Sequence, residues 1–286
     1  MADATVTHAD HQVEESNWGG GSRPFKASYG KLMMWYFLLS DAFTFAGFLI
    51  AYGTLRVSMN TWPVPDHVFS TFPGGLHHKP LYFVTVMTFV LLFSSFTMVR
   101  AVQEGQRENK NGVVFWMLLT ILGGLGFLGC QAWEWNTLIA KEHVSITKNP
   151  FSAHVQAGVY LEGDGHDIKE GDTFEAGEPY LIHKHDGEWH NLKYKLTEDG
   201  PQGKAGDVME QQFGPKAFGA LFFFITGFHG FHVLSGVVFL LIIMLNVATG
   251  LYVKRRNGYE MVEKIGLYWH FVDLVWVFVF LVFYLL

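Results

Sequence analysis

The stretch KAFGALFFFITGFHGFHVLSGVVFLLIIMLNVA, residues 216–248, decides the fold class of this chain. It is long and apolar enough to cross the roughly 30 Å hydrocarbon core of a bilayer, which takes about 20 apolar residues. Four similar blocks lie at residues 31–55, 81–102, 113–140 and 265–286. Because the bilayer core holds no water to satisfy backbone groups, we expect all five blocks to be helices. The sequence therefore predicts an all-α integral membrane protein with five transmembrane helices.

The composition agrees with a membrane protein and excludes several other classes. Half of the 286 residues are hydrophobic, 16% are aromatic and only 16% are charged. These fractions exclude a disordered chain and a coiled coil. The net charge of −6 argues against nucleic acid as a partner, since phosphate binding needs a basic surface. The single cysteine, Cys130, excludes a disulfide framework, a thiolate cluster and a dicopper centre built on two cysteines of this chain.

Basic residues beside the spans predict the orientation in the membrane, because lysine and arginine favour the cytoplasmic side. They gather before the first block, between the second and third, and between the fourth and fifth: Arg23, Lys26, Lys31, Arg100, Arg107, Lys110, Lys254, Arg255, Arg256 and Lys264. We therefore expect a cytoplasmic N-terminus and a periplasmic C-terminus. Residues 1–30 then form a polar cytoplasmic tail without the features of a signal peptide, and we expect His8 and His11 to be solvated there.

The expected organisation is the tail, three helices in 31–140, an acidic periplasmic element in 141–215 and two helices in 216–286. The acidic element holds fourteen Asp and Glu against seven Lys, so its charge of −7 accounts for the acidity of the whole chain. Short alternating runs and turn pairs such as Asp186-Gly187 predict a small antiparallel hairpin element. Two interpretations stay open: a solvated loop packed on a neighbouring subunit, and an anionic face for a basic partner. His183 and His185 would share one face of a strand, which is a weak indication of a metal site.

Polar side chains interrupt the apolar blocks, and such groups normally face protein or water because they are costly in lipid. They are Asp41 in the first block, Gln131 and Glu134 in the third, Thr226, His229 and His232 in the fourth, and His270 and Asp273 in the fifth. Spacings of three place neighbours on one helical face, and nearby glycines allow close helix approach. The sequence thus predicts a helical bundle with a polar seam.

Three interpretations of this seam are open from the residues alone. Glu134 is neutral or paired, with His232 as a candidate, and only fixes helix packing. His229 or His232 faces His270 and ligates a haem, although axial histidines have no need of carboxylates beside them. Glu134 and Asp273 carry protons in a transporter, although five spans without an internal repeat are a poor match to transporter folds.

The chain resembles subunit III of haem-copper cytochrome c oxidases in all five spans. LGCQAWEW at 128–135, TGFHGFHVLSG at 226–236 and YWHFVDLVWVFVFLVFY at 268–284 carry the resemblance, with WYFLLSDAFTFAGFL at 35–49 and LLFSSFTMVRAV at 91–102 in support. The order GFHGxHV and then WHFVDxVW is specific to that family.

The resemblance implies a non-catalytic core subunit of a proton-pumping terminal oxidase in the bacterial inner membrane. Members bind no haem or copper; these lie on partner subunits I and II. They are thought to hold structural phospholipid, to give oxygen access and to sustain proton uptake. The family's intramembrane glutamate falls on Glu134, and its other polar positions fall on His229, His232, Trp269, His270 and Asp273.

Three departures from the family limit this transfer. The family's usual Ser-Glu is Ser40-Asp41 here, and the shorter carboxylate reaches about one bond less. Many relatives have seven helices, whereas this chain resembles the five-helix bacterial form. The element at 141–215 is much longer than the family connection, so its role cannot be carried over.

The resemblance also leaves the electron donor open. Quinol oxidases and some nitric oxide reductases have related chains, and the competing class is a stand-alone membrane transporter. The acidic element favours cytochrome c, which is commonly basic, or another respiratory complex as a neighbour.

Overall fold

A computed structural model describes residues 28–72, 81–254 and 258–286 of the chain. Within these residues it has five helices long and apolar enough to cross a membrane, as the sequence predicts. Their bounds are α1 Tyr29–Ser58, α3 Tyr82–Gln106, α4 Lys110–Ala140, α5 Lys216–Ala248 and α7 Glu260–Phe280, which continues into a π-helical turn, η1 Leu281–Leu285. The tail with His8, His11, Arg23 and Lys26, and also Arg255 and Arg256, lies outside the described residues.

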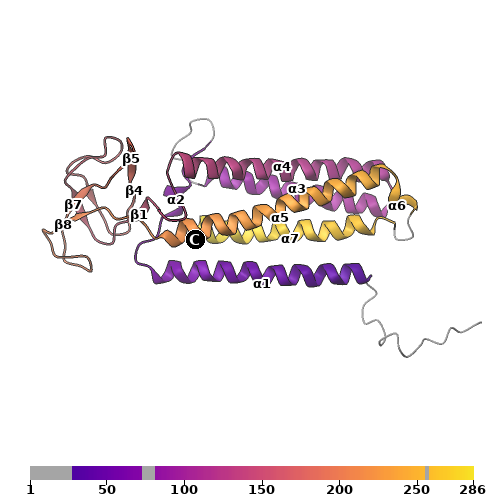
Figure 1. Ribbon diagram of the computed structural model, residues 1–286, viewed down its shortest axis with the longest axis horizontal. Coiled ribbons are helices and arrows are strands. Elements are labelled where there is room, and N and C mark those ends of the chain that lie inside the picture. Colours follow the sequence, from indigo (N-terminus) through magenta and orange to yellow (C-terminus); the bar gives the residue numbers. More distant parts are fainter. Residues whose placement is uncertain (1–27, 73–80, 255–257) are drawn as a thin grey trace, which may run out of the picture.

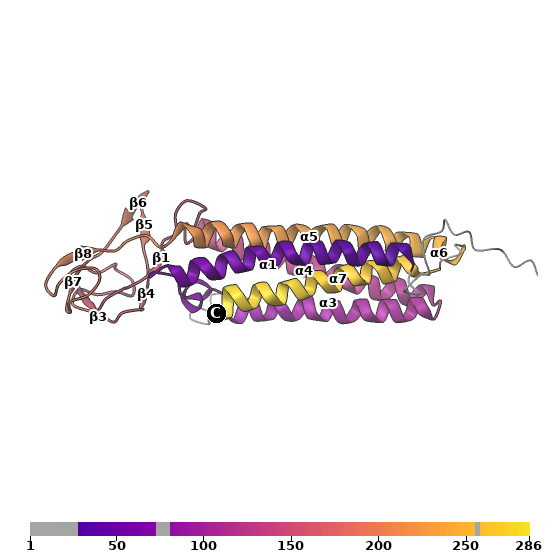
Figure 2. The same ribbon diagram turned by 90° about the horizontal axis from the view of Figure 1, so that it is seen from below.

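The five helices run side by side in one elongated bundle (Figures 1 and 2). One end carries the short helix α2 (Pro65–Val68), the β-rich element and the C-terminus. The other end carries the α3–α4 connection and the short helix α6 (Leu251–Lys254). The connections that the sequence predicts on opposite sides of a membrane are therefore at opposite ends of the bundle.

Helix α1 begins two residues before its predicted apolar block, and the Ser28 side chain caps its first turn. The Ser28 hydroxyl accepts the N–H of Lys31 at 3.4 Å and donates to Glu260. Lys31 also forms an ion pair with Glu263, Nζ to Oε2 at 2.7 Å. These contacts fasten the start of α1 to the start of α7.

The four helices α3, α4, α5 and α7 form the tight part of the bundle. Trp269 of α7 is fully buried among them, and its Nε1 donates to the Ser94 hydroxyl at 3.1 Å. Two glycines make room for its ring: a Cβ added at Gly124 would lie 2.6 Å from the indole, and one at Gly236 3.0 Å from it. The glycines in these spans therefore allow a close approach around one tryptophan.

Helix α1 packs more loosely than the other four. Among its 30 residues only Leu38, Phe45 and Tyr52 are buried. Trp35 and Phe43 are 61% and 71% exposed. Most of the surface of α1 is thus available to lipid or to another protein.

The region between α4 and α5 is β-rich, as expected. Strand β1 (Phe151–Ala153) pairs with β4 (Pro179–Leu181), and β5 (His183–His185) forms a hairpin with β6 (Glu188–His190). The remaining strands form an antiparallel sheet in the order β3-β2-β7-β8, with bounds Thr173–Phe174, Gly158–Tyr160, Lys193–Leu196 and Val208–Glu210. The β5–β6 turn is the predicted Asp186-Gly187 pair, with φ of 47° and 91°, as a tight hairpin turn with both central residues at positive φ requires.

The four-stranded sheet has a small core separate from that of the bundle. Its buried members are Tyr160, Phe174, Leu192, Tyr194 and Leu196. His154 lies against this core, with its ring stacked on Phe174 at 3.6 Å between centroids and its Nε2 2.6 Å from the Tyr160 hydroxyl. The β-rich element therefore has an apolar interior of its own, although it is small.

We predict that acid destabilises the β-rich element through His154. Burial lowers the pKa of His154 from 6.5 to about 4, so between these values the unfolded chain binds the proton more tightly and stability falls as the pH falls. The full loss is about 3 kcal/mol below pH 4. Hydrogen exchange of the full chain measures this loss. As the pH falls, the β2 amides should lose protection against exchange relative to the α4 amides. His154→Phe keeps an aromatic ring without the titration, and equal acid sensitivity in this variant would contradict the prediction.

Candidate functional site

The predicted polar residues do not form one continuous seam. They form separate contacts, each joining two elements of the bundle: α1 with α5, α4 with η1, α4 with α5, α5 with α7, and α3 with α7.

Asp41 of α1 and His232 of α5 form the most polar contact inside the bundle. The Asp41 Oδ2 lies 2.8 Å from the His232 Nε2, and both side chains are largely buried. The His232 Nδ1 donates to the Phe228 carbonyl at 2.8 Å, so this nitrogen carries a proton. The other ring nitrogen of His232 faces the Asp41 carboxyl, so the contact joins α5 to α1. The sequence-based suggestion that Glu134 pairs with His232 is wrong, because Asp41 takes that position.

Glu134 of α4 is held by Tyr284. The Tyr284 hydroxyl lies 3.2 Å from Oε1 and 3.0 Å from Oε2 of the carboxyl, and both side chains are buried. Tyr284 stands in the π-helical turn η1, and such turns are rare and often found at functional sites. Tyr284 is not among the polar residues predicted from the sequence, although a hydroxyl at the end of the apolar run VFVFLVFY is a signal for it.

Gln131 lies one turn before Glu134 and contacts a different element. Its Nε2 donates to the Thr226 carbonyl at 3.2 Å, and the Trp135 indole donates to the Thr226 hydroxyl at 3.3 Å. That hydroxyl donates in turn to the Phe222 carbonyl at 2.6 Å. These bonds tie α4 to α5 and give Gln131 a structural role in the bundle.

His229 and His270 point to different neighbours. The His229 Nε2 donates to the Val272 carbonyl at 3.0 Å, whereas the His270 Nδ1 lies 2.7 Å from the Ser95 hydroxyl on α3. The facing pair of imidazoles that haem ligation needs is therefore not formed, and that interpretation is not supported. Asp273 is buried, and its Oδ1 has no hydrogen-bond partner among the described residues.

In the described part of the chain, no three side chains of His, Cys, Asp or Glu already converge on a position that could hold a metal. In the bundle, the imidazoles of His229, His232 and His270 are each engaged by a carbonyl, a carboxylate or a hydroxyl. The arrangement inside the membrane is therefore suited to fixing helices to one another.

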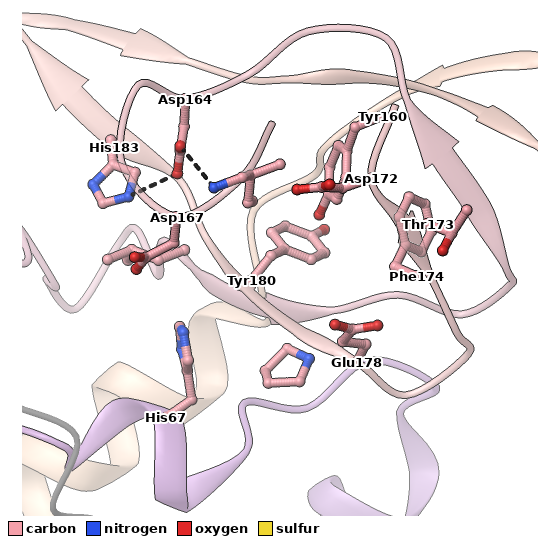
Figure 3. Close-up of a pocket in the computed structure, with 13 residues that line it drawn as sticks. His67, Tyr160, Asp164, Asp167, Asp172, Thr173, Phe174, Glu178, Tyr180 and His183 are labelled. Carbon is pink, nitrogen blue, oxygen red and sulfur yellow. Dashed lines mark hydrogen bonds and ion pairs between the residues drawn. The ribbon is translucent and has the colours of Figure 1, made fainter. Parts of the chain in front are cut away.

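An acidic cavity of about 430 Å³ lies where the β-rich element meets α2 (Figure 3). Four carboxylates and aromatic rings line it, together with two imidazoles: Asp164, Asp167, Asp172, Glu178, Tyr160, Phe174, Tyr180, His67 and His183. Burial lowers the pKa of His67, so its ring adds no positive charge near neutral pH. The sequence located the acidity in this region, but the cavity depends on how the loops fold back.

Comparison with known proteins points to one family. The model of the family described as cytochrome c oxidase subunit III matches residues 208–286. Quinol oxidase subunit 3 of Bacillus spizizenii is 25% identical over 96% of this chain and 98% of its own length. These matches support the subunit III family of haem-copper oxidases.

Other members of the subunit III family show the same level of similarity. Cytochrome c oxidase subunit 3 of Alkalihalophilus pseudofirmus is 24% identical over 89% of this chain and 85% of its own length. Cytochrome bo(3) ubiquinol oxidase subunit 3 of Pseudomonas putida is 26% identical over 89% of this chain and 84% of its own length. This chain is therefore a multi-pass membrane subunit of a terminal oxidase complex, which is an oxidoreductase.

We predict an energetic coupling between Asp41 and His232. Replacing either residue by alanine should destabilise the protein by about 1–3 kcal/mol, because it leaves the other polar group buried without its partner. The double variant should cost less than the sum of the two. Thermal unfolding in detergent measures the stability of the wild type, the two single variants and the double variant. Ser40→Ala, at an exposed position on the same helix, is the control. Strictly additive losses would show that the two side chains do not interact.

Proposed function

We propose that this subunit III is a non-catalytic core subunit of a proton-pumping oxidase that passes electrons from cytochrome c to oxygen. Haem and copper then lie on subunits I and II, and the complex resides in the bacterial inner membrane with the N-terminus of this chain in the cytoplasm. The observation that carries the proposal is that Asp41, Glu134 and His232 are each held by a side chain of the same subunit. Groups bound in this way brace helices and are not free to ligate a redox centre.

The exposed surface of α1 supports a place within a larger complex. Large apolar side chains such as Trp35, Phe43 and Ile50 are exposed along it, and in a membrane they contact lipid or a neighbouring subunit. We propose that structural phospholipid and partner subunits cover this surface. The roles in oxygen access and sustained proton uptake come from the family resemblance.

The acidic cavity supports cytochrome c as the electron donor. A charge of −7 on residues 141–215 attracts a basic protein at long range, and four carboxylates surround the cavity. A second candidate is a quinol donor, because the relatives in Bacillus spizizenii and Pseudomonas putida are named as quinol and ubiquinol oxidase subunits. A quinol reaches its site from the membrane and needs no acidic surface.

The proposed function is tested on the purified complex. This subunit should co-purify with haem- and copper-bearing chains, and reduced cytochrome c should reduce the haems faster than a quinol does, as followed by reduced-minus-oxidised spectra. Glu134→Ala should leave these spectra intact and shorten the period of sustained turnover. Isolation of the subunit alone as a functional carrier would refute the oxidase assignment, and reduction by quinol alone would establish the second candidate.

We predict that neutralising the acidic cavity weakens the reaction with cytochrome c. Asp167→Asn combined with Glu178→Gln should lower kcat/KM for cytochrome c several-fold at low ionic strength and have little effect in high salt, since screening removes long-range attraction. The control is Glu198→Gln combined with Glu210→Gln, which changes the net charge equally outside the cavity. An equal loss of kcat/KM in the control would show that only the net charge matters. No loss in either variant would show that the cavity does not bind the electron donor.

A further inference from the structure

Four histidines gather on the β-rich element, away from the membrane-spanning residues. In the β5–β6 hairpin, His183 pairs in register with His190, and His185 pairs with Glu188. Residues directly opposite each other in an antiparallel ladder lie on the same face, and so do residues two apart on one strand. Three imidazoles therefore share one face of this hairpin.

A fourth imidazole lies over the same face. His166, from the connection between β2 and β3, has its ring centroid 5.1 Å from that of His183 and 5.7 Å from that of His185. The rings of His185 and His190 are 5.5 Å apart, and those of His183 and His185 are 6.4 Å apart. We call these four residues, His166, His183, His185 and His190, the histidine cluster.

Three of these four separations, 5.1, 5.5 and 5.7 Å, match those of imidazoles that share one metal ion. A metal–nitrogen bond of about 2.0–2.1 Å places the ring centroid about 3 Å from the metal, so two rings on one ion have centroids about 5 to 6 Å apart. We propose that the histidine cluster binds one divalent transition-metal ion of the class that prefers imidazole, Cu²⁺ or Zn²⁺. Divalent Cu should bind more tightly than Zn, and Mg²⁺ and Ca²⁺ should not compete, because they prefer oxygen ligands.

Asp164 supports the proposed site from behind His183. Its Oδ2 lies 3.6 Å from the His183 Nε2, and its Oδ1 accepts the backbone N–H groups of His166 at 2.8 Å and Ile168 at 2.9 Å (Figure 3 shows Asp164 beside His183). One carboxylate thus fixes the turn that carries His166 and stands beside a second ligand. Carboxylates commonly occupy this position next to metal-binding histidines.

Binding of one ion by the histidine cluster requires its side chains to rotate. The nitrogens of the histidine cluster do not yet converge on one point in the described structure. However, His166, His185 and His190 are exposed, so their imidazoles can turn without disturbing a packed core. The net charge of −7 around them also favours a cation. This site is independent of the proposed oxidase function, because no residue of the bundle takes part.

The first experiment titrates tag-free, full-length chain in detergent with Cu²⁺ or Zn²⁺ salts. We expect one ion per chain, and electron paramagnetic resonance of the Cu²⁺ form should show at least two coordinated imidazole nitrogens. His166→Gln and His185→Gln should each weaken binding at least about tenfold. Lys184→Gln is the matched control, because it changes the opposite face of β5 and should bind as the wild type does.

A second measurement does not depend on the isolated chain. Purified oxidase complexes carrying the wild-type chain or the double variant His166→Gln/His185→Gln are incubated with Zn²⁺, washed and analysed for zinc. If the complex with the wild-type chain holds one more zinc ion than the complex with the double variant, the result supports the site. Equal zinc contents, or wild-type affinity in both single variants, would overturn the proposal.

Discussion

The absence of water inside the bilayer is the constraint on which the rest of this structure depends. A polar group there must find its partner within the protein, since leaving it unpaired costs several kcal/mol. Asp41 and His232 meet this requirement through each other, and Glu134 meets it through the Tyr284 hydroxyl. Each pair can form only when two separate elements have the right register. The polar pairs therefore favour one arrangement of the helices, whereas apolar side chains alone would allow several.

Much of the fold follows from the sequence because hydropathy and turn chemistry are local properties. Block length predicts all five spans, and the Asp186-Gly187 pair predicts the tightest hairpin turn. The helix ends are less predictable, since caps such as Ser28 depend on a distant partner, Glu260. The spacing of polar residues likewise gives the face on which a side chain lies, but not which helix lies opposite it. This is why Asp41, and not Glu134, proved to be the partner of His232.

Residues without a periodic signal were harder to anticipate. Tyr284 resembles its aromatic neighbours by hydropathy, and its contact with Glu134 depends on the π-helical turn at the end of the chain. His166 lies in an irregular connection, so no strand pattern places it over His183 and His185. The cavity beside α2 is lined by residues of strands β2 to β5, of the connections between them and of α2, and its carboxylates are spread along the sequence. Tertiary structure, not local propensity, brings these groups together.

The loose packing of α1 has a consequence for the order of events during synthesis. Helix α1 is translated before α5 and α7, yet Asp41 contacts His232 of α5, and Ser28 is 232 positions away from its partner Glu260 at the start of α7. Until α5 is inserted, Asp41 has no His232 beside it, and a lone carboxylate at the centre of a membrane helix costs about 2.5–3.5 kcal/mol on the scale of insertion by the translocon. Helix α1 therefore gains these contacts only after the helices translated later have been inserted.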